Sequence, residues 1–154
     1  MVDRTDTVTI NRPVEDVFAY VSDTSNDPAW HTDILEAEKV TEGPIGVGTR
    51  WRLRFKPFMG VSESTSEVVE FEPNRKEVLR GVAGPMTTTL TYTFEPVAGG
   101  TRHARRVQIS IAGWMKLMDP LMRLMVPKRN GTFLANLKRV LERSPGSTPS
   151  SNMG

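Results

Sequence analysis

Residues 49–56, which read TRWRLRFK, indicate most clearly how this chain folds. Large apolar side chains alternate with basic ones throughout the stretch. Successive side chains of a β-strand point to opposite faces of its sheet, so this alternation predicts a strand with one buried and one solvated face. In residues 89–94 and 106–111, apolar side chains likewise alternate with polar ones. Such strands, separated by short turns, predict an antiparallel sheet.

The residues around these strands predict the remaining elements. Residues 7–11 alternate in the same way and predict a first strand, which is followed by two short helices at residues 13–23 and 27–31. In the second of these helices we expect Asp27 to be the N-cap. Six further strands, separated by turns that contain glycine or proline, are expected in the middle of the chain.

Beyond Gly113 the apolar residues follow the period of a helix and predict a long amphipathic C-terminal helix. We expect a kink or a break in it near Pro127 and Gly131. Residues 144–154, SPGSTPSSNMG, have almost nothing to bury and are predicted to form a disordered tail. The sequence therefore predicts one α+β domain over residues 1–143, in which a helix covers the apolar face of a curved sheet.

The composition excludes several kinds of site. The 154 residues include no cysteine, which excludes disulfides, thiolate zinc sites, iron–sulfur clusters and cysteine nucleophiles. Because the chain holds only two histidines, we expect no metal site, and no cofactor is implied.

Charge and hydropathy restrict the partners in the same way. The net charge of +2 reflects a small basic surplus, so we expect no nucleic-acid partner. The most apolar stretch, residues 114–126, is too short and too often interrupted by charges to span a membrane. The N-terminal residues do not look like a signal peptide, so we expect a cytoplasmic protein, either a monomer or a homodimer.

Several short segments resemble one family. Residues 10–18, INRPVEDVF, followed by Pro28 and Trp30, resemble the opening of the polyketide cyclase/dehydrase branch of the START-like, or SRPBCC, superfamily, which also includes the birch-pollen-allergen-like proteins. The C-terminal residues 137–142 are similar too. Over residues 4–143 the resemblance implies a helix-grip fold: a curved, seven-stranded antiparallel sheet wrapped around a long C-terminal helix, with two short helices between strands one and two.

A bent sheet touches a helix along a line, so this fold leaves room for a cavity between them. The resemblance implies activities that include hydrophobic-ligand carriers, aromatase/cyclases and chaperone activators. We expect a carrier or sensor of a small hydrophobic molecule of the lipid, polyketide or isoprenoid type. The alternatives are a polyketide aromatase/cyclase- or dehydratase-like enzyme and a protein-interaction module of the chaperone-activator type, so the sequence leaves open whether a reaction is catalysed.

Inward-facing apolar residues are the candidates for ligand binding, although each of them also suits an ordinary core. They are Trp51, Leu53, Phe55, Phe71, Tyr92, Phe94, Val107, Ile109, Met118, Met122 and Met125. Polar residues predicted on the same faces are more informative, since burying them without a partner is costly. Arg80 and Arg105 are candidates for holding a carboxylate or an enolate, and Glu67 and His103 are candidates for proton transfer. A β-bulge would reverse such assignments beyond it.

Overall fold

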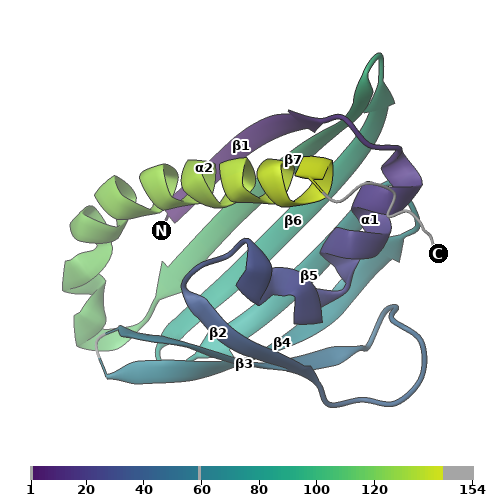
Figure 1. The fold of residues 1–154 in the computed structure, drawn as a ribbon. Coiled ribbons are helices and arrows are strands. Elements are labelled where there is room, and N and C mark those ends of the chain that lie inside the picture. The colour runs from purple at the N-terminus through teal and green to yellow at the C-terminus, as the bar shows by residue number, and fades with distance from the viewer. Residues whose placement is uncertain (1, 59, 144–154) are drawn as a thin grey trace.

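The computed structural model describes residues 2–58 and 60–143 (Figure 1). Its elements follow the chain as β1 (Val2–Ile10), α1 (Val14–Ser22), η1 (Thr24–Ala29), β2 (Ile34–Lys39), β3 (Arg50–Phe58), β4 (Val61–Glu72), β5 (Lys76–Ala83), β6 (Met86–Val97), β7 (Gly100–Ile111), η2 (Gly113–Met118) and α2 (Asp119–Arg143). The predicted tail, residues 144–154, lies outside the described residues.

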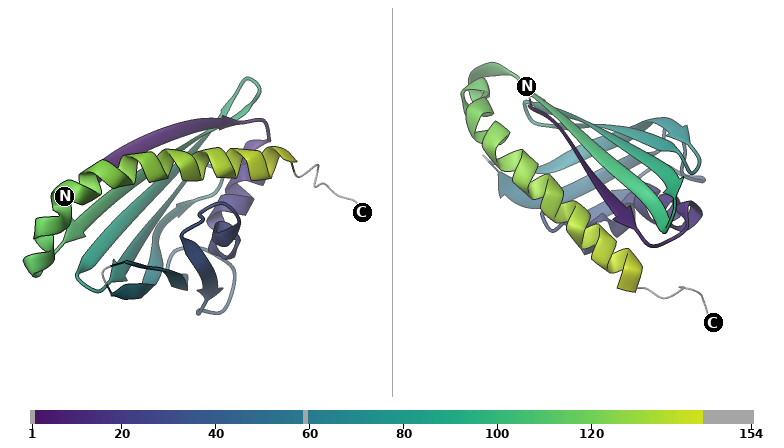
Figure 2. Two further views of the ribbon diagram at one scale, coloured as in Figure 1. Left: turned by 60° about the vertical axis from the view of Figure 1, so that its left-hand side comes forward. Right: turned by 90° about the horizontal axis from the view of Figure 1, so that it is seen from above.

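The strands form one seven-stranded antiparallel sheet in the order β1-β7-β6-β5-β4-β3-β2. Each strand therefore lies beside its neighbour in sequence, except that β1 pairs with β7. Helix α2 lies across one face of the curved sheet, with α1 and η1 on the same side (Figures 1 and 2). The predicted helix-grip α+β fold is confirmed.

The helices differ from the prediction in two details. The second short helix is the 3-10 helix η1, and the carboxylate that accepts a backbone hydrogen bond at its start, from the amide of Ser25, belongs to Asp23. Asp27 is therefore not the cap. Helix α2 continues from Asp119 to Arg143, so of the predicted kink or break the break is wrong. Met122 and Phe133, on either side of the proposed break, are both buried, and this packing favours one continuous helix.

Strand β4 contains a β-bulge that decides which of its side chains face inward. Val68 pairs with Leu79 and Glu70 with Val78, so Val69 is the extra residue between them. Ser66 and Val68 are buried before the bulge, and Glu67 lies on the outer face opposite Arg80. The inward orientation predicted for Glu67 and Arg80 is wrong. The bulge lies between Glu67 and Phe71, so these two residues do not share a face of the sheet. Arg80 has the same parity as Val78, which pairs with Glu70 and lies on the outer side of the sheet.

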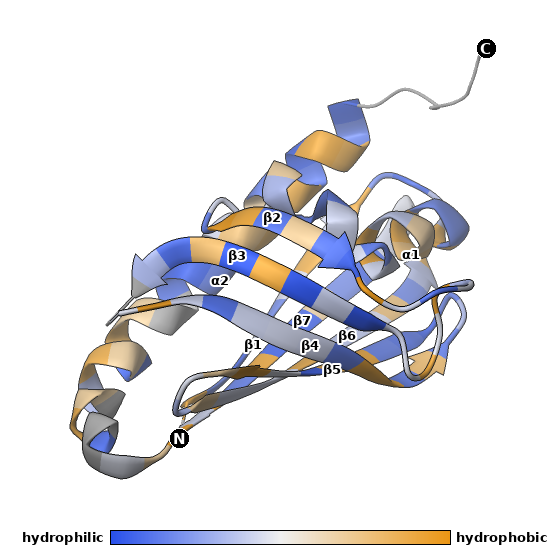
Figure 3. Ribbon diagram, turned by 90° about the horizontal axis from the view of Figure 1, so that it is seen from below, coloured by the Kyte–Doolittle hydropathy of each residue, from blue (hydrophilic) through white to orange (hydrophobic). Residues whose placement is uncertain are grey.

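The outer face of the sheet is charged. Hydrophilic and hydrophobic residues alternate along β3 (Figure 3), and the outward arginines form three ion pairs with neighbouring strands. These pairs are Glu36–Arg54, Glu38–Arg52 and Arg50–Glu67. Among the described residues, no helix is long and apolar enough to cross a membrane.

The inner face carries two separate clusters of buried apolar residues. The larger one joins α1 and the C-terminal half of α2 to the sheet and includes Phe18, Trp30, Trp51 and Leu137. The smaller one is formed by Val2, Met86, Ile111 and Met122. The two clusters leave space between them.

Candidate functional site

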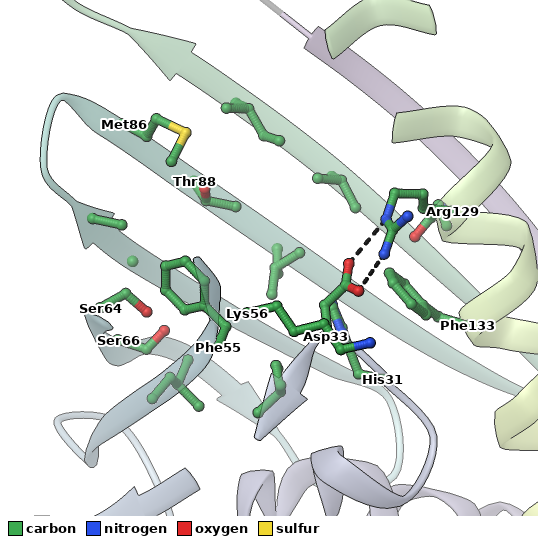
Figure 4. Close-up of a pocket in the computed structure, with 18 of the residues that line it drawn as sticks. His31, Asp33, Phe55, Lys56, Ser64, Ser66, Met86, Thr88, Arg129 and Phe133 are labelled. Atoms are coloured by element: carbon green, nitrogen blue, oxygen red, sulfur yellow. Dashed lines mark hydrogen bonds and ion pairs between the residues drawn. The ribbon is translucent and has the colours of Figure 1, made fainter. Parts of the chain in front are cut away.

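A cavity of about 460 Å³ lies between the sheet and α2 and borders both apolar clusters. Strands β2 to β7, helix α2 and the segment after η1 all contribute to its wall (Figure 4). Most of the lining side chains are apolar: Ile34, Leu53, Phe55, Pro57, Ala83, Met86, Leu90, Val107, Ile109, Met122, Met125 and Phe133. Such a wall suits the apolar body of a small molecule.

The polar lining residues fall into two groups. Ser64 and Ser66 of β4 and Thr88 of β6 place hydroxyl groups on the sheet side of the cavity (Figure 4). The second group lies towards α2 and the segment after η1: His31, Asp33, Lys56, Arg105, Arg129 and Asn130. The cavity therefore combines a largely apolar wall with a group of charged and polar side chains on one side.

Arg105 is the one buried guanidinium among the described residues, with 4% of the residue exposed. Its Nη1 donates a hydrogen bond to Asn130 Oδ1. Its guanidinium carbon lies 5.8 Å from the ring centroids of both Trp30 and Phe133, within the range of cation–π attraction. Its Nε has no hydrogen-bond partner among the described residues.

Asn130 links this arginine to the edge strand. Its Nδ2 donates to Asp6 Oδ2 at 2.7 Å and to the backbone oxygen of Arg105 at 3.2 Å, which turns its side-chain oxygen towards the guanidinium. Partial burial alone would raise the pKa of Asp6, but hydrogen bonds from Arg4 and Asn130 outweigh this and lower it. Asp6, Asn130 and Arg105 thus form a chain that holds the arginine side chain in place.

Two carboxyl groups, those of Glu77 and Asp27, are buried in the same domain. Burial, together with nearby Asp27, raises the pKa of Glu77 to about 9, and neither of its carboxyl oxygens has a hydrogen-bond partner among the described residues. Burial raises the pKa of Asp27 well above its ordinary value, despite the opposing attraction of Arg105. Both groups therefore favour the protonated, uncharged form.

The two histidines occupy different environments. His31 lines the cavity and stacks on Phe133, with ring centroids 3.8 Å apart. Burial, reinforced by the charge of Arg105, lowers the pKa of His31 well below its ordinary value. His103 is fully buried, and its Nδ1 lies 3.0 Å from the backbone oxygen of Thr93. Burial lowers the pKa of His103 to about 4, so both rings are neutral at pH 7.

An ion pair spans the rim of the cavity. Arg129 of α2 donates to both carboxylate oxygens of Asp33, with Nε 2.9 Å from Oδ2 (Figure 4). The guanidinium carbon of Arg129 also lies 5.7 Å from the ring centroid of Phe133. Arg129 and Phe133 also line a second hollow of about 300 Å³, together with Thr32 and Lys128. Together with Met125, these two side chains line both the cavity and the second hollow.

The structure brings some of the residues predicted for the site together at the cavity and places others elsewhere. The lining includes Leu53, Phe55, Arg105, Val107, Ile109, Met122 and Met125. Four inward aromatic residues pack into the larger core cluster instead: Trp51, Phe71, Tyr92 and Phe94. Met118 does not line the cavity.

The candidates for proton transfer lie outside the cavity. Glu67 is on the outer face, with its Oε1 3.5 Å from Arg50 Nε, and Arg80 beside it is exposed. His103 faces inward but lies beneath Phe94 and does not reach the cavity. Among the side chains described, no group of three or more His, Asp or Glu residues is arranged to hold a metal ion.

Several lining residues were not predicted for the site. Among them are Asp33, Ser64, Ser66, Thr88, Arg129, Asn130 and Phe133. Phe133 follows Met122 and Met125 on one helical face, so the helical period offered a signal for it. The two serines are missed because of the bulge in β4.

Comparison with solved structures shows the same fold in distant proteins. TTHA0849 of Thermus thermophilus is 20% identical, with a TM-score of 0.73 over 93% of this chain and 99% of that one. The di-domain ARO/CYC protein BexL, from the BE-7585A biosynthetic pathway, is 18% identical, with a TM-score of 0.74 over 97% of this chain. StfQ, a di-domain ARO/CYC protein of the steffimycin pathway, is 15% identical, with a TM-score of 0.72 over 90% of this chain. This chain spans 48% of BexL and 49% of StfQ.

The sequence itself identifies the family. No curated protein matches it. Residues 1–142, however, match the family described as polyketide cyclase / dehydrase and lipid transport. That match covers all the secondary structure except the last residue of α2. The chain is therefore a member of the polyketide cyclase / dehydrase and lipid transport family.

Proposed function

We propose that this protein binds a small hydrophobic molecule, of the lipid, polyketide or isoprenoid type, in the cavity beneath α2, and acts as a carrier or sensor. The observation that carries the proposal is the cavity of about 460 Å³ with its largely apolar wall. A ligand that buries roughly 300 Å² of apolar surface gains on the order of 7 kcal/mol before the costs of association.

Carrier or sensor activity is favoured over catalysis by the position of the titratable groups. Glu67 is outside the cavity and His103 is sealed from it. An enzyme of the aromatase/cyclase type is the second candidate, supported by the likeness in fold to BexL and StfQ. It would have to rely on Arg105 and His31 within the cavity. The ion pairs on the outer sheet face argue against an apolar docking surface there, and so against an interaction module that uses that face.

Filling the cavity tests the proposal. Ile109 lines it, whereas the next residue, Ser110, is exposed. Ile109→Trp should weaken the binding of the neutral apolar dye Nile red at least about tenfold, since the indole occupies the ligand's space. Ser110→Trp adds the same side chain to the exposed side of the strand and should leave the affinity unchanged. Equal affinities for the two variants, measured by fluorescence titration, would place the binding site elsewhere.

Native mass spectrometry of the purified protein distinguishes the two candidate functions. A carrier or sensor should retain a small molecule whose mass disappears on denaturation. If the bound molecule is released chemically unchanged, this result supports the carrier or sensor function. Conversion of a supplied poly-β-ketone into a cyclised or dehydrated product would establish the enzyme instead.

The rim ion pair is expected to control how fast a ligand leaves. Asp33→Asn removes the partner of Arg129, so Nile red should dissociate several-fold faster in a stopped-flow experiment. The free energy of unfolding should change by less than about 1 kcal/mol, because the pair is partly exposed. Glu36→Gln, which breaks an ion pair on the outer face, is the control and should leave the rate unchanged. The same rate in all three proteins would mean that Arg129 does not restrict exit.

A further inference from the structure

The positive charge of Arg105 lacks a direct counter-charge in the protein. The side-chain groups that accept hydrogen bonds from it, the amide of Asn130 and the phenol of Tyr92, are both neutral, and Asp6 is reached only through that amide. Among the side chains described, no carboxylate forms an ion pair with Arg105. A buried charge without a partner is costly, so such a site favours the arrival of an anion.

The other buried titratable groups do not balance this charge. The raised pKa values of Glu77 and Asp27 keep these acids from supplying a negative charge. His31 and His103 add no positive charge, because their pKa values are lowered. Near neutral pH the guanidinium of Arg105 therefore keeps its positive charge, which the more distant carboxylate of Asp6 balances only in part.

Arg105 is also open to the cavity, which separates it from an ordinary structural arginine. It belongs to the cavity lining together with Asn130 and Phe133. Its contact with Trp30, a member of the larger core cluster, places it at the end of the cavity that borders this cluster. From there the apolar lining continues along β7 through Val107 and Ile109.

We infer that the ligand is an amphipathic molecule with a single carboxylate, which binds to Arg105 while the apolar body lies along β7 towards Met122. This inference rests on the proposed hydrophobic-ligand function and adds the chemistry of the head group. The planar guanidinium matches a carboxylate in shape and charge. The other two cations of the lining differ, since Arg129 is already paired with Asp33 and Lys56 is exposed.

The experiment compares two probes of equal length, dodecanoate and dodecan-1-ol, by displacement of Nile red at pH 8. The wild-type protein should bind dodecanoate at least about tenfold more tightly than the alcohol, as expected for a hydrogen bond to a charged group. Arg105→Met should reduce this ratio to about one and leave the affinity for the alcohol within about threefold. Arg129→Met is the matched control, because it removes the same group from the same cavity, and it should keep the wild-type ratio.

Each outcome decides the inference. A wild-type protein that binds the alcohol as tightly as the carboxylate overturns it, even if Arg105→Met does not fold. Loss of the ratio in Arg129→Met but not in Arg105→Met moves the anion site to the rim and also overturns it. Tighter binding of dodecyl phosphate than of dodecanoate would overturn the carboxylate assignment. If neither Nile red nor either probe binds, the proposed function itself fails, whereas binding without preference contradicts only the head-group inference.

Discussion

Raising the pH from 7 to 9 is expected to lower the free energy of unfolding by roughly 2–3 kcal/mol through Glu77 alone. Burial, together with nearby Asp27, raises the pKa of Glu77 to about 9 in the folded protein, against an ordinary value of 4.5. Over this range the folded protein holds a proton that the unfolded chain has released, so stability falls as the pH rises towards 9. Asp27, whose pKa is also raised, acts in the same direction. The histidines contribute little above pH 7, because their rings are neutral in the folded protein and mostly neutral in the unfolded chain.

Chemical denaturation at pH 7, 8 and 9 measures this dependence. Glu77→Gln cannot ionise, so its stability should change much less with pH and should exceed that of the wild type by several kcal/mol at pH 9. Glu67→Gln removes a carboxyl group from the exposed face of β4 and should keep the wild-type slope. If Glu77→Gln shows the wild-type slope, Glu77 is not the group that titrates.

Gly100→Ala is expected to cost about 3 kcal/mol or more of stability. Gly100 has a φ of +138°, and a Cβ added there would lie 2.0 Å from the backbone oxygen of Ile10. No rotation of a side chain relieves this clash, because both groups are fixed to the backbone. The first residues of β7 would have to move away from the end of β1, where Thr101 pairs with Ile10 and donates to the backbone oxygen of Arg12.

Two other glycines separate the clash from the backbone conformation. Gly99 has a φ of +87° but no atom near an added Cβ, so Gly99→Ala should cost about 1 kcal/mol. Gly46 has neither constraint, so Gly46→Ala should change the stability little. Urea denaturation should give the order Gly46, Gly99, Gly100 in increasing cost. Equal costs at Gly99 and Gly100 would contradict the role of the contact with Ile10.

The fold could be predicted because its signals are local. Alternation in residues 49–56 depends only on which face of one strand is buried, and the structure shows that strand as β3. The same reasoning works on β7, which pairs with β6 without a register shift, so Arg105 and His103 face inward as their parity indicates. Where a strand is regular, the face of a residue follows from its position in the sequence.

The site was harder to predict because inward-facing residues do not all reach the cavity. Phe71 and Phe94 face inward but pack against Phe18 of α1, at ring-centroid distances of 5.2 and 5.0 Å. Ile109 lies farther along the sheet, where α1 does not cover it. The position of a helix from another part of the chain therefore separates core residues from lining residues. Likewise, the pairing of Asp33 with Arg129 joins residues 96 positions apart, and no local pattern indicates it.

The bulge at Val69 has a consequence for folding specificity. If β4 paired without it, while keeping the register of Phe71 with Glu77, Glu63 and Glu67 would turn inward and Ser64, Ser66 and Val68 would turn outward. That misfolded arrangement would bury two carboxylates and expose an apolar residue, both of which cost free energy. The glutamates of the outer face thus select one strand register during folding and disfavour its nearest competitor.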